Sequence, residues 1–227
     1  METSNSPSTK FSFTLILFCI LTFHISASTT IVNYDFNSGT TFATLAPSDI
    51  GGIATTFSSN LGFATNPIGT ASGASSFEIN TTSGKSLELT NSSGSNTNYF
   101  QLELSGVNLQ NYASYRIYVQ SHGSVGGATQ LNVFYSTDGT SWTYFNRVNE
   151  FATISTSSWN EAIIDLGGVN ELNFSGTLYF RLCAFGGTVA NPIQIDNLQV
   201  SASYINPSTT GLKTLWRGGC LQCQSIA

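Results

Sequence analysis

Charged residues are scarce in this sequence. Its 7 Lys and Arg and 12 Asp and Glu make up 8% of the residues, against about 25% in a typical soluble domain. The net charge is −5 and no cluster of Lys or Arg occurs, which argues against nucleic acid or an anionic membrane as a partner, because both bind basic surfaces. Ser, Thr, Asn and Gly take the place of charged residues, and a hydrophobic content of 41% does not fit a disordered chain. The composition is typical of an extracellular β-protein.

Side chains that commonly catalyse reactions are also few. After the N-terminal segment the sequence has one histidine, His122, in a glycine-rich stretch, and no GxSxG, HExxH or other nucleophile motif accompanies it. Carboxylates such as Glu161 and Asp165 fall on one side of a predicted strand, but glycosidases need two acids across a cleft, and spacing alone selects no pair. We therefore predict that the protein is not an enzyme.

Cysteine is sparse: Cys19, Cys183, Cys220 and Cys223. The CxxC formed by the last two lacks the two further ligands of a zinc site and the βαβ surroundings of a thioredoxin-like motif. The spacing leaves open a disulfide between Cys183 and one of these residues, or one within the CxxC.

Residues 1–28 have the features of a secretory signal peptide. Lys10 precedes the apolar run 11–25, and the small residues 26–28 provide a cleavage site. An uncleaved anchor is the alternative, but the run is shorter than the about 20 apolar residues that span a bilayer, and no later segment is long enough. We expect a protein that is secreted, extracellular or at the cell surface, with no membrane span after signal cleavage.

The remaining sequence divides in two. Residues 29–204 have the length of one β-sandwich domain, long enough to bury a substantial core without disulfides. Residues 205–227 begin with the linker-like stretch 207–211 and show no strand alternation, so we predict a flexible tail there.

The clearest local signal is a β-hairpin over residues 130–145. Apolar positions recur with a period of two, which puts Leu131, Val133 and Tyr135 against a core. The dipeptide 138–139, Asp-Gly, then supplies a turn, because Gly accepts a positive φ without a steric penalty.

Similar alternation recurs along the chain with turn residues between, and no stretch has a sustained helical period. The stretches are 77–79, 86–90, 98–105, 115–120, 160–166, 177–185 and 192–201. In the last one the apolar phase shifts after Ile195, which predicts a β-bulge near Asp196 and Asn197. We predict an all-β protein: an antiparallel two-sheet β-sandwich of the jelly-roll (galactose-binding-like) type with roughly eight to ten strands.

Five stretches carry a resemblance to a known family: YDFNSG at 34–39, NYFQLELSG at 98–106, YSTDGTSW at 135–142, GTLYFRL at 176–182 and IDNLQVSA at 195–202. Over about residues 31–203 the chain resembles the secreted bacterial jelly-roll domains of surface proteins that carry PEP-CTERM or type IX sorting signals. Those domains are similar in shape to carbohydrate-binding modules. The C-terminal sequence GGCLQCQSIA has neither a PEP motif with its apolar helix nor an obvious type IX signal domain. The resemblance implies a fold more than any one function.

The resemblance also implies a structural calcium ion, because carbohydrate-binding jelly rolls commonly hold one between their first and last strands. Residues 31–36 are the predicted first strand, and Asp35 and Asn37 lie near its end. Asp196 lies at the predicted bulge of the last strand. Hard oxygen ligands of this kind are what Ca²⁺ requires. The relatives often have Glu where Asn37 stands, and a neutral amide weakens binding.

A polysaccharide or other glycan is the predicted partner. If the Leu, Ile and Val positions face inward, the opposite face of the middle strands carries Arg116, Tyr118, Gln120, Asn132, Phe134, Tyr179 and Arg181. Aromatic rings stack on the apolar faces of sugars, and Arg, Asn and Gln donate to hydroxyls. The alternative is that this face is covered and its aromatic residues only pack.

The sequence is compatible with two functions. The first is a secreted, non-catalytic module that binds polysaccharide or another cell-surface glycan. The second is a structural or adhesive protein of the cell surface or extracellular matrix with no small-molecule ligand.

Overall fold

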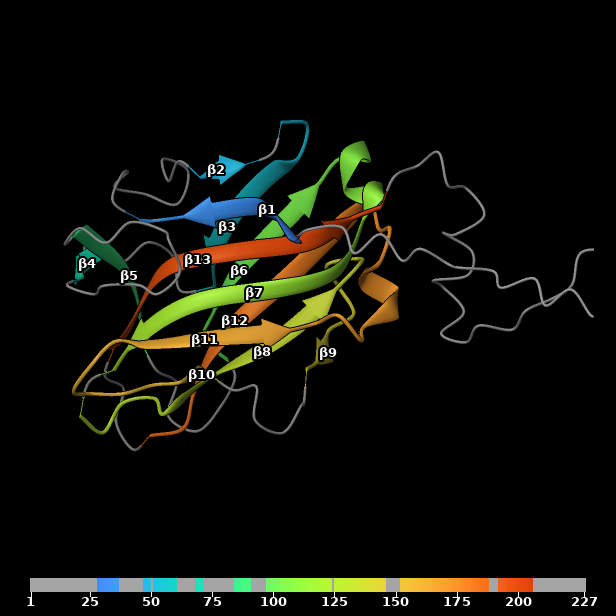
Figure 1. Ribbon diagram of the computed structural model, residues 1–227. Coiled ribbons are helices and arrows are strands. Elements are labelled where there is room, and N and C mark those ends of the chain that lie inside the picture. Colours follow the sequence, from blue (N-terminus) through green and yellow to red (C-terminus); the bar gives the residue numbers. More distant parts are fainter. Residues whose placement is uncertain are drawn as a thin grey trace, which may run out of the picture.

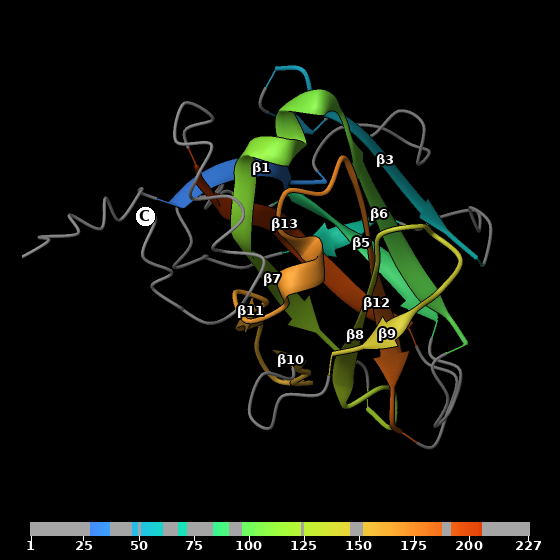
Figure 2. The same ribbon diagram turned by 90° about the vertical axis from the view of Figure 1, so that its right-hand side faces the viewer.

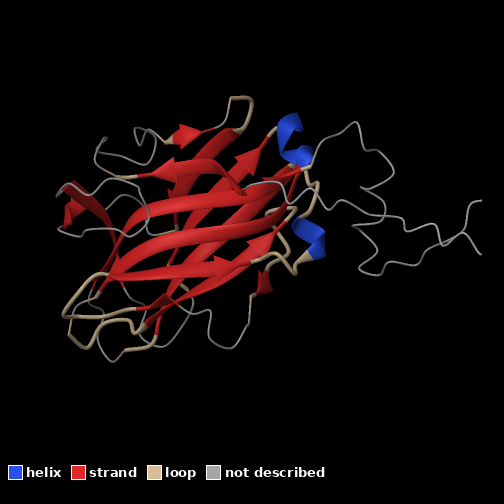
Figure 3. Ribbon diagram, in the orientation of Figure 1, coloured by secondary structure: helices blue, strands red, loops and turns tan. Residues whose placement is uncertain are grey.

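Two antiparallel β-sheets pack face to face in the computed structural model (Figures 1 and 3). It describes residues 28–36, 47–49, 51–60, 68–71, 84–90, 97–123, 125–145, 152–187 and 192–205. The described residues form thirteen strands, and three of these have only two residues. The prediction of an all-β jelly-roll sandwich is confirmed.

The first layer, sheet A, has seven strands: β1 (Ser28–Tyr34), β2 (Ser48–Asp49), β4 (Ile68–Ala71), β5 (Gly84–Thr90), β7 (Tyr112–His122), β11 (Asn160–Asp165) and β13 (Pro192–Tyr204). Its main order is β11-β7-β13-β1-β2, and β5 pairs with both β13 and β4. The long strand β13 is central, because it pairs with β7 on one side and with β5 and then β1 on the other.

The second layer, sheet B, has six strands: β3 (Ala54–Ser59), β6 (Tyr99–Ser105), β8 (Gln130–Ser136), β9 (Thr143–Tyr144), β10 (Ala152–Thr153) and β12 (Thr177–Phe185). Its order is β10-β8-β12-β6-β3, and β9 also pairs with β8. Two short 3-10 helices, η2 (Val107–Asn111) and η3 (Asn170–Leu172), lie at one end of the sandwich (Figures 2 and 3).

The core lies between the sheets and follows the period of two. On β12, Leu178, Phe180 and Leu182 are buried in the core cluster, and the residues between them point to the opposite face. On β8 the same holds for the predicted inward residues, Leu131, Val133 and Tyr135.

The predicted hairpin and bulge are both present. Phe134 pairs with Tyr144, so the chain turns back through residues 137–142, which contain the predicted Asp-Gly turn. On β13 the register with β7 shifts between Asp196 and Gln199, which confirms the bulge.

Several predictions concern residues outside the described ranges. These are the signal peptide except for Ser28, the predicted calcium ligand Asn37, the predicted strand 77–79, and the tail after Ile205 with Cys220 and Cys223. Among the described residues, no helix is long and apolar enough to cross a membrane.

Candidate functional site

The seven candidate glycan-binding residues divide between the two sheets and do not form one surface. Sheet A carries Arg116, Tyr118 and Gln120 on β7, whereas sheet B carries Asn132 and Phe134 on β8 and Tyr179 and Arg181 on β12. The chain crosses from one layer to the other between β7 and β8. The two groups therefore lie on different outer faces of the sandwich.

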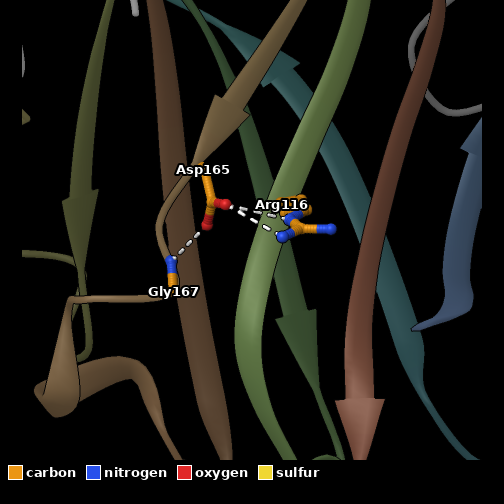
Figure 4. A network of polar contacts seen from close by, with 3 residues as sticks. All are labelled: Arg116, Asp165 and Gly167. Atoms are coloured by element: carbon orange, nitrogen blue, oxygen red, sulfur yellow. Dashed lines mark hydrogen bonds and ion pairs between the residues drawn. The ribbon is translucent and has the colours of Figure 1, made fainter. Parts of the chain in front are cut away.

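On sheet A, Arg116 is engaged with Asp165 of the neighbouring strand β11 (Figure 4). Its Nε donates to Asp165 Oδ2 at 3.1 Å, and its Nη2 lies 3.0 Å from the same oxygen. The hydrogen bond and charge of Asp165 raise the pKa of Arg116 above its ordinary value. Asp165 Oδ1 also accepts the backbone N–H of Gly167 at 2.8 Å, so this carboxylate fixes the chain where β11 ends.

Gln120 is fully buried and bound to neighbouring side chains. Its Nε2 donates to Glu161 Oε1 at 3.1 Å, and its Oε1 accepts from Asn197 Nδ2 at 2.5 Å. This amide ties β7 to the bulge of β13 and to β11. Its donor and acceptor therefore serve the fold instead of a ligand on the outer face.

On sheet B, Arg181 lies between two aromatic rings. Its guanidinium carbon is 4.0 Å from the ring centroid of Tyr99 and 3.7 Å from that of Trp142. Its Nε donates to Gln101 Oε1 at 2.9 Å. Cation–π attraction favours this stacking over the ring faces, and the planar guanidinium keeps a fixed orientation. In the described part of the chain, no carboxylate forms an ion pair with Arg181.

Tyr179 extends this arrangement along β12. Its ring meets Trp142 edge to face at a centroid distance of 6.4 Å. The Tyr179 ring also lies against Gly139. The φ of Gly139 is +73°, and a Cβ added there would lie 3.0 Å from Tyr179 Cζ. Only glycine combines this backbone conformation with such a close approach. Desolvation and the nearby charges of Glu103 and Asp138 raise the pKa of Tyr179.

The turn before Trp142 is held by Asp138. Its Oδ1 accepts the backbone N–H groups of Thr140 at 2.8 Å and Ser141 at 2.7 Å, and the hydroxyl of Ser136 at 2.9 Å. These hydrogen bonds to the ionised form hold the pKa of Asp138 well below its usual range. The turn thus presents Trp142 to Arg181 in a defined position.

Asn132 and Phe134 lie on the same face of sheet B, under residues of the hairpin. Phe134 packs against Tyr144, with ring centroids 5.0 Å apart, and is half-buried. Asn132 is only 2% exposed. Its Oδ1 accepts hydrogen bonds from Gln130 Nε2 at 2.9 Å and from the Tyr144 hydroxyl at 3.4 Å. Asn132 therefore holds Gln130 and Tyr144 in place and is not itself accessible to a ligand.

We call the half-buried group Tyr99, Trp142, Tyr179 and Arg181 the aromatic platform. Gln101 and Glu103 of β6 lie beside it, since they pair with Arg181 and Tyr179 of β12. The seven candidates include Tyr179 and Arg181 but omit Tyr99, Gln101, Glu103 and Trp142. The alternation of β6 places its three residues on the outer face, and this signal was sufficient to find them. Trp142 follows a turn, where no periodicity applies.

The side chains that were considered for catalysis and set aside, His122, Glu161 and Asp165, have structural neighbours. His122 is the last residue of β7, and its ring lies 5.6 Å from that of Trp159. The two carboxylates Glu161 and Asp165 bind Gln120 and Arg116.

Of the predicted calcium ligands, Asp35 and Asp196 are among the described residues, and they lie near the point where β13 changes its neighbour. This strand pairs with β5 up to Ile195 and with β1 from Leu198 on, so Asp196 and Asn197 face a gap between β5 and the end of β1. Asp196 is 7% exposed, and burial raises the pKa of its carboxyl to about 7. The backbone N–H of Asn197 opposes this shift, and the charge of Asp35 adds to it.

This neighbourhood fits a hard cation in part. Asp35 and Asp196 are close enough for each other's charge to matter, and Asn197 Oδ1 is buried without a hydrogen-bond partner in the described residues. Those residues contain no group of three or more His, Cys, Asp or Glu side chains that could hold a metal. A calcium ion here needs amide and backbone oxygens as well, which Ca²⁺ accepts.

Comparison with known proteins gives similarities of structure only. No family model matches the sequence, and no curated protein matches it. The CBM22-1 xylan-binding domain of Xyn10C from Paenibacillus barcinonensis is 14% identical, with 80% of this chain and 99% of that chain covered and a TM-score of 0.46. The K3 cleaved adhesin domain of Lys-gingipain from Porphyromonas gingivalis is 15% identical, with 77% and 99% covered and a TM-score of 0.37.

A third solved structure, TmCBM61 in complex with β-1,4-galactotriose, is 14% identical, with 64% and 86% covered and a TM-score of 0.33. At these identities and TM-scores no family is assigned. The fold assignment rests on the strand order and pairing of this chain.

Proposed function

We propose that this protein is a secreted, non-catalytic module that binds polysaccharide or another cell-surface glycan through the aromatic platform of sheet B. The observation that carries the proposal is the stack of Arg181 between Tyr99 and Trp142, with Tyr179 at its side. The rings offer apolar surface for the faces of sugar rings. The guanidinium, Gln101 and Glu103 offer hydrogen-bonding groups for their hydroxyls.

The way the platform is held supports binding. Arg181 is fixed by two rings and by Gln101, and Tyr179 is fixed by Trp142 and Gly139. Side chains that are already ordered lose little conformational entropy when a ligand arrives. Tyrosine and tryptophan also give large contact areas with few rotatable bonds.

Affinity electrophoresis in gels that contain xylan, mixed-linkage glucan, galactan or mannan tests the proposal. We expect at least one polysaccharide to retard the wild-type protein, and Trp142→Ala and Tyr179→Ala to abolish the retardation. Tyr118→Ala is the matched control, because Tyr118 is a half-buried tyrosine on the outer face of the other sheet. If none of these polysaccharides retards the protein and no glycan in a broad array binds it, the structural or adhesive role is favoured.

The same proposal includes a structural calcium ion at the bulge of β13. Asp196 and Asp35 would supply carboxylate oxygens, with Asn37 as a further ligand. Burial, and to a smaller extent the charge of Asp35, disfavour ionisation of Asp196, and a divalent cation would oppose both effects. Calorimetric titration of Ca²⁺ into chelator-stripped protein is the test, with Asp196→Asn as the comparison. Absence of both heat and a rise in melting temperature would eliminate the ion.

A further inference from the structure

The two 3-10 helices lie at one end of the sandwich (Figure 2). A polar recess lies beside the second of them, η3. Its volume is about 360 Å³. The described residues that line it come from the turn after β8 and from the segment around η3, and they are Thr137, Asn170, Glu171, Asn173 and Ser175.

The lining of the recess suits hydroxyl groups. Its described side chains are two hydroxyls, two amides and one carboxylate, with no Lys or Arg and no aromatic ring among them. Such groups donate to and accept from alcohols. The carboxylate of Glu171 without a cation beside it disfavours an anionic ligand, because like charges repel.

Part of this lining is already held in place. Burial, and next the neighbouring carboxylate of Glu171, raise the pKa of Tyr135 on β8 to about 12, so Tyr135 lies close to Glu171. Asn173 is 3% exposed, and its Oδ1 accepts the backbone N–H of Ser114 at 2.9 Å. Its Nδ2 is buried and has no acceptor among the described residues. Through its hydrogen bond to Ser114, Asn173 is held in a fixed position in the wall of the recess.

The register of sheet B places the recess next to the aromatic platform. Ser136, the last residue of β8, pairs with Tyr179 of β12, and Thr137 follows it in the turn. Ser175 precedes Tyr179 by four residues, which span no more than about 14 Å of extended chain. Gly139, which touches Tyr179, lies two residues after Thr137. The platform and the recess thus share the turn 137–139.

We propose that the recess is a second sugar subsite, which binds the hydroxyls of a neutral sugar residue in the same polysaccharide chain that the aromatic platform holds. The inference rests on the proposed function and adds to it a direction and a minimum length of the ligand. A disaccharide on the platform leaves the recess empty. A longer neutral chain reaches Thr137 and Glu171, which lie beyond the end of β8 and before the start of β12.

Calorimetric titration with xylo-oligosaccharides and cello-oligosaccharides, from the disaccharide to the hexasaccharide, tests this. We expect affinity to rise with length until the recess is occupied. Thr137→Val and Glu171→Gln should then weaken binding of the hexasaccharide about three- to tenfold, the effect of one lost hydrogen bond, and leave the disaccharide unchanged. Glu161→Gln, on sheet A, is the matched control and should change neither.

The outcomes separate the two proposals. Trp142→Ala should weaken binding of every length, because it removes the platform. If the wild type binds the disaccharide and hexasaccharide equally, or if Thr137→Val and Glu171→Gln leave the hexasaccharide affinity unchanged, the second subsite is refuted and the platform stands. If no oligosaccharide of either series binds, and none from any other polysaccharide that retards the protein in gels, both fail. Amide chemical shifts give an independent readout, since those of Thr137 and Ser175 should move with the hexasaccharide and not with the disaccharide.

Discussion

The buried carboxyl of Asp196 should make the protein more stable in mild acid than at neutral pH when calcium is removed. Its pKa in the folded state is about 7, against an ordinary value of 3.8. Between these values the folded protein binds a proton that the unfolded chain has lost. The free energy of unfolding therefore falls as pH rises from about 4 to about 7. Outside that window the contribution of Asp196 to this free energy does not change with pH.

The size of the effect follows from the two pKa values. Each pKa unit corresponds to about 1.4 kcal/mol, so the free energy of unfolding should fall by at most about 4 kcal/mol across the window. Any water that reaches the Asp196 carboxyl screens its charge and makes the fall in free energy smaller than this upper limit. In the Asp196→Asn variant the contribution disappears, because an amide does not ionise and keeps much the same shape.

Urea denaturation in the presence of a chelator, at several pH values from about 4 to about 8, measures the effect over the window set by Asp196. Asp165→Asn is the control, since that carboxylate is partly exposed and paired with Arg116. Calcium should remove the loss of stability near neutral pH if the ion binds at this site. A wild-type stability that stays constant or rises over the window would refute the assignment of the raised pKa, as would the same pH dependence in Asp196→Asn.

Three further predictions concern packing. Phe180→Ala should lower the free energy of unfolding by about 3–5 kcal/mol in urea denaturation, since it leaves a cavity between the sheets; a loss below about 1 kcal/mol would contradict the assigned core. Gly139→Ala should cost about 1 kcal/mol and alter the near-UV circular dichroism of the platform, because its φ is positive and its Cβ meets Tyr179. Gly51→Ala, where an added Cβ has open space, is its control and should change neither quantity. Arg116→Met should cost less than about 1 kcal/mol in thermal or urea denaturation, as is usual for an exposed ion pair, and a larger loss would assign it a structural role.

Local patterns in the sequence were sufficient to predict the longer strands, whereas no stretch was assigned to the short strands β2, β4 and β10. Alternation of side chains identified the inward residues of β8 and β12, and the phase shift after Ile195 identified the bulge in β13. These features depend on neighbouring residues in the chain, so a period of two and its interruption reveal them.

The assignment of strands to sheets was not predictable in the same way. The outward residues of β7 and β8 have the same alternation, yet β7 pairs with β11 and β13 whereas β8 pairs with β12. Alternation tells which side of a strand faces the core and does not tell which sheet the strand joins. Tyr118 and Phe134 were therefore predicted on one face although they lie on different layers of the sandwich.

The hairpin connects this local chemistry to the proposed binding face. Asp138 Oδ1 accepts hydrogen bonds from the backbone of the turn itself, so the role of Asp138 is structural. The turn nevertheless sets two contacts of the aromatic platform, Gly139 against Tyr179 and Trp142 over Arg181. Both contacts exist without a ligand. A sugar chain that binds here meets rings already in position, so more of the contact energy is available for affinity than on a surface that must first become ordered.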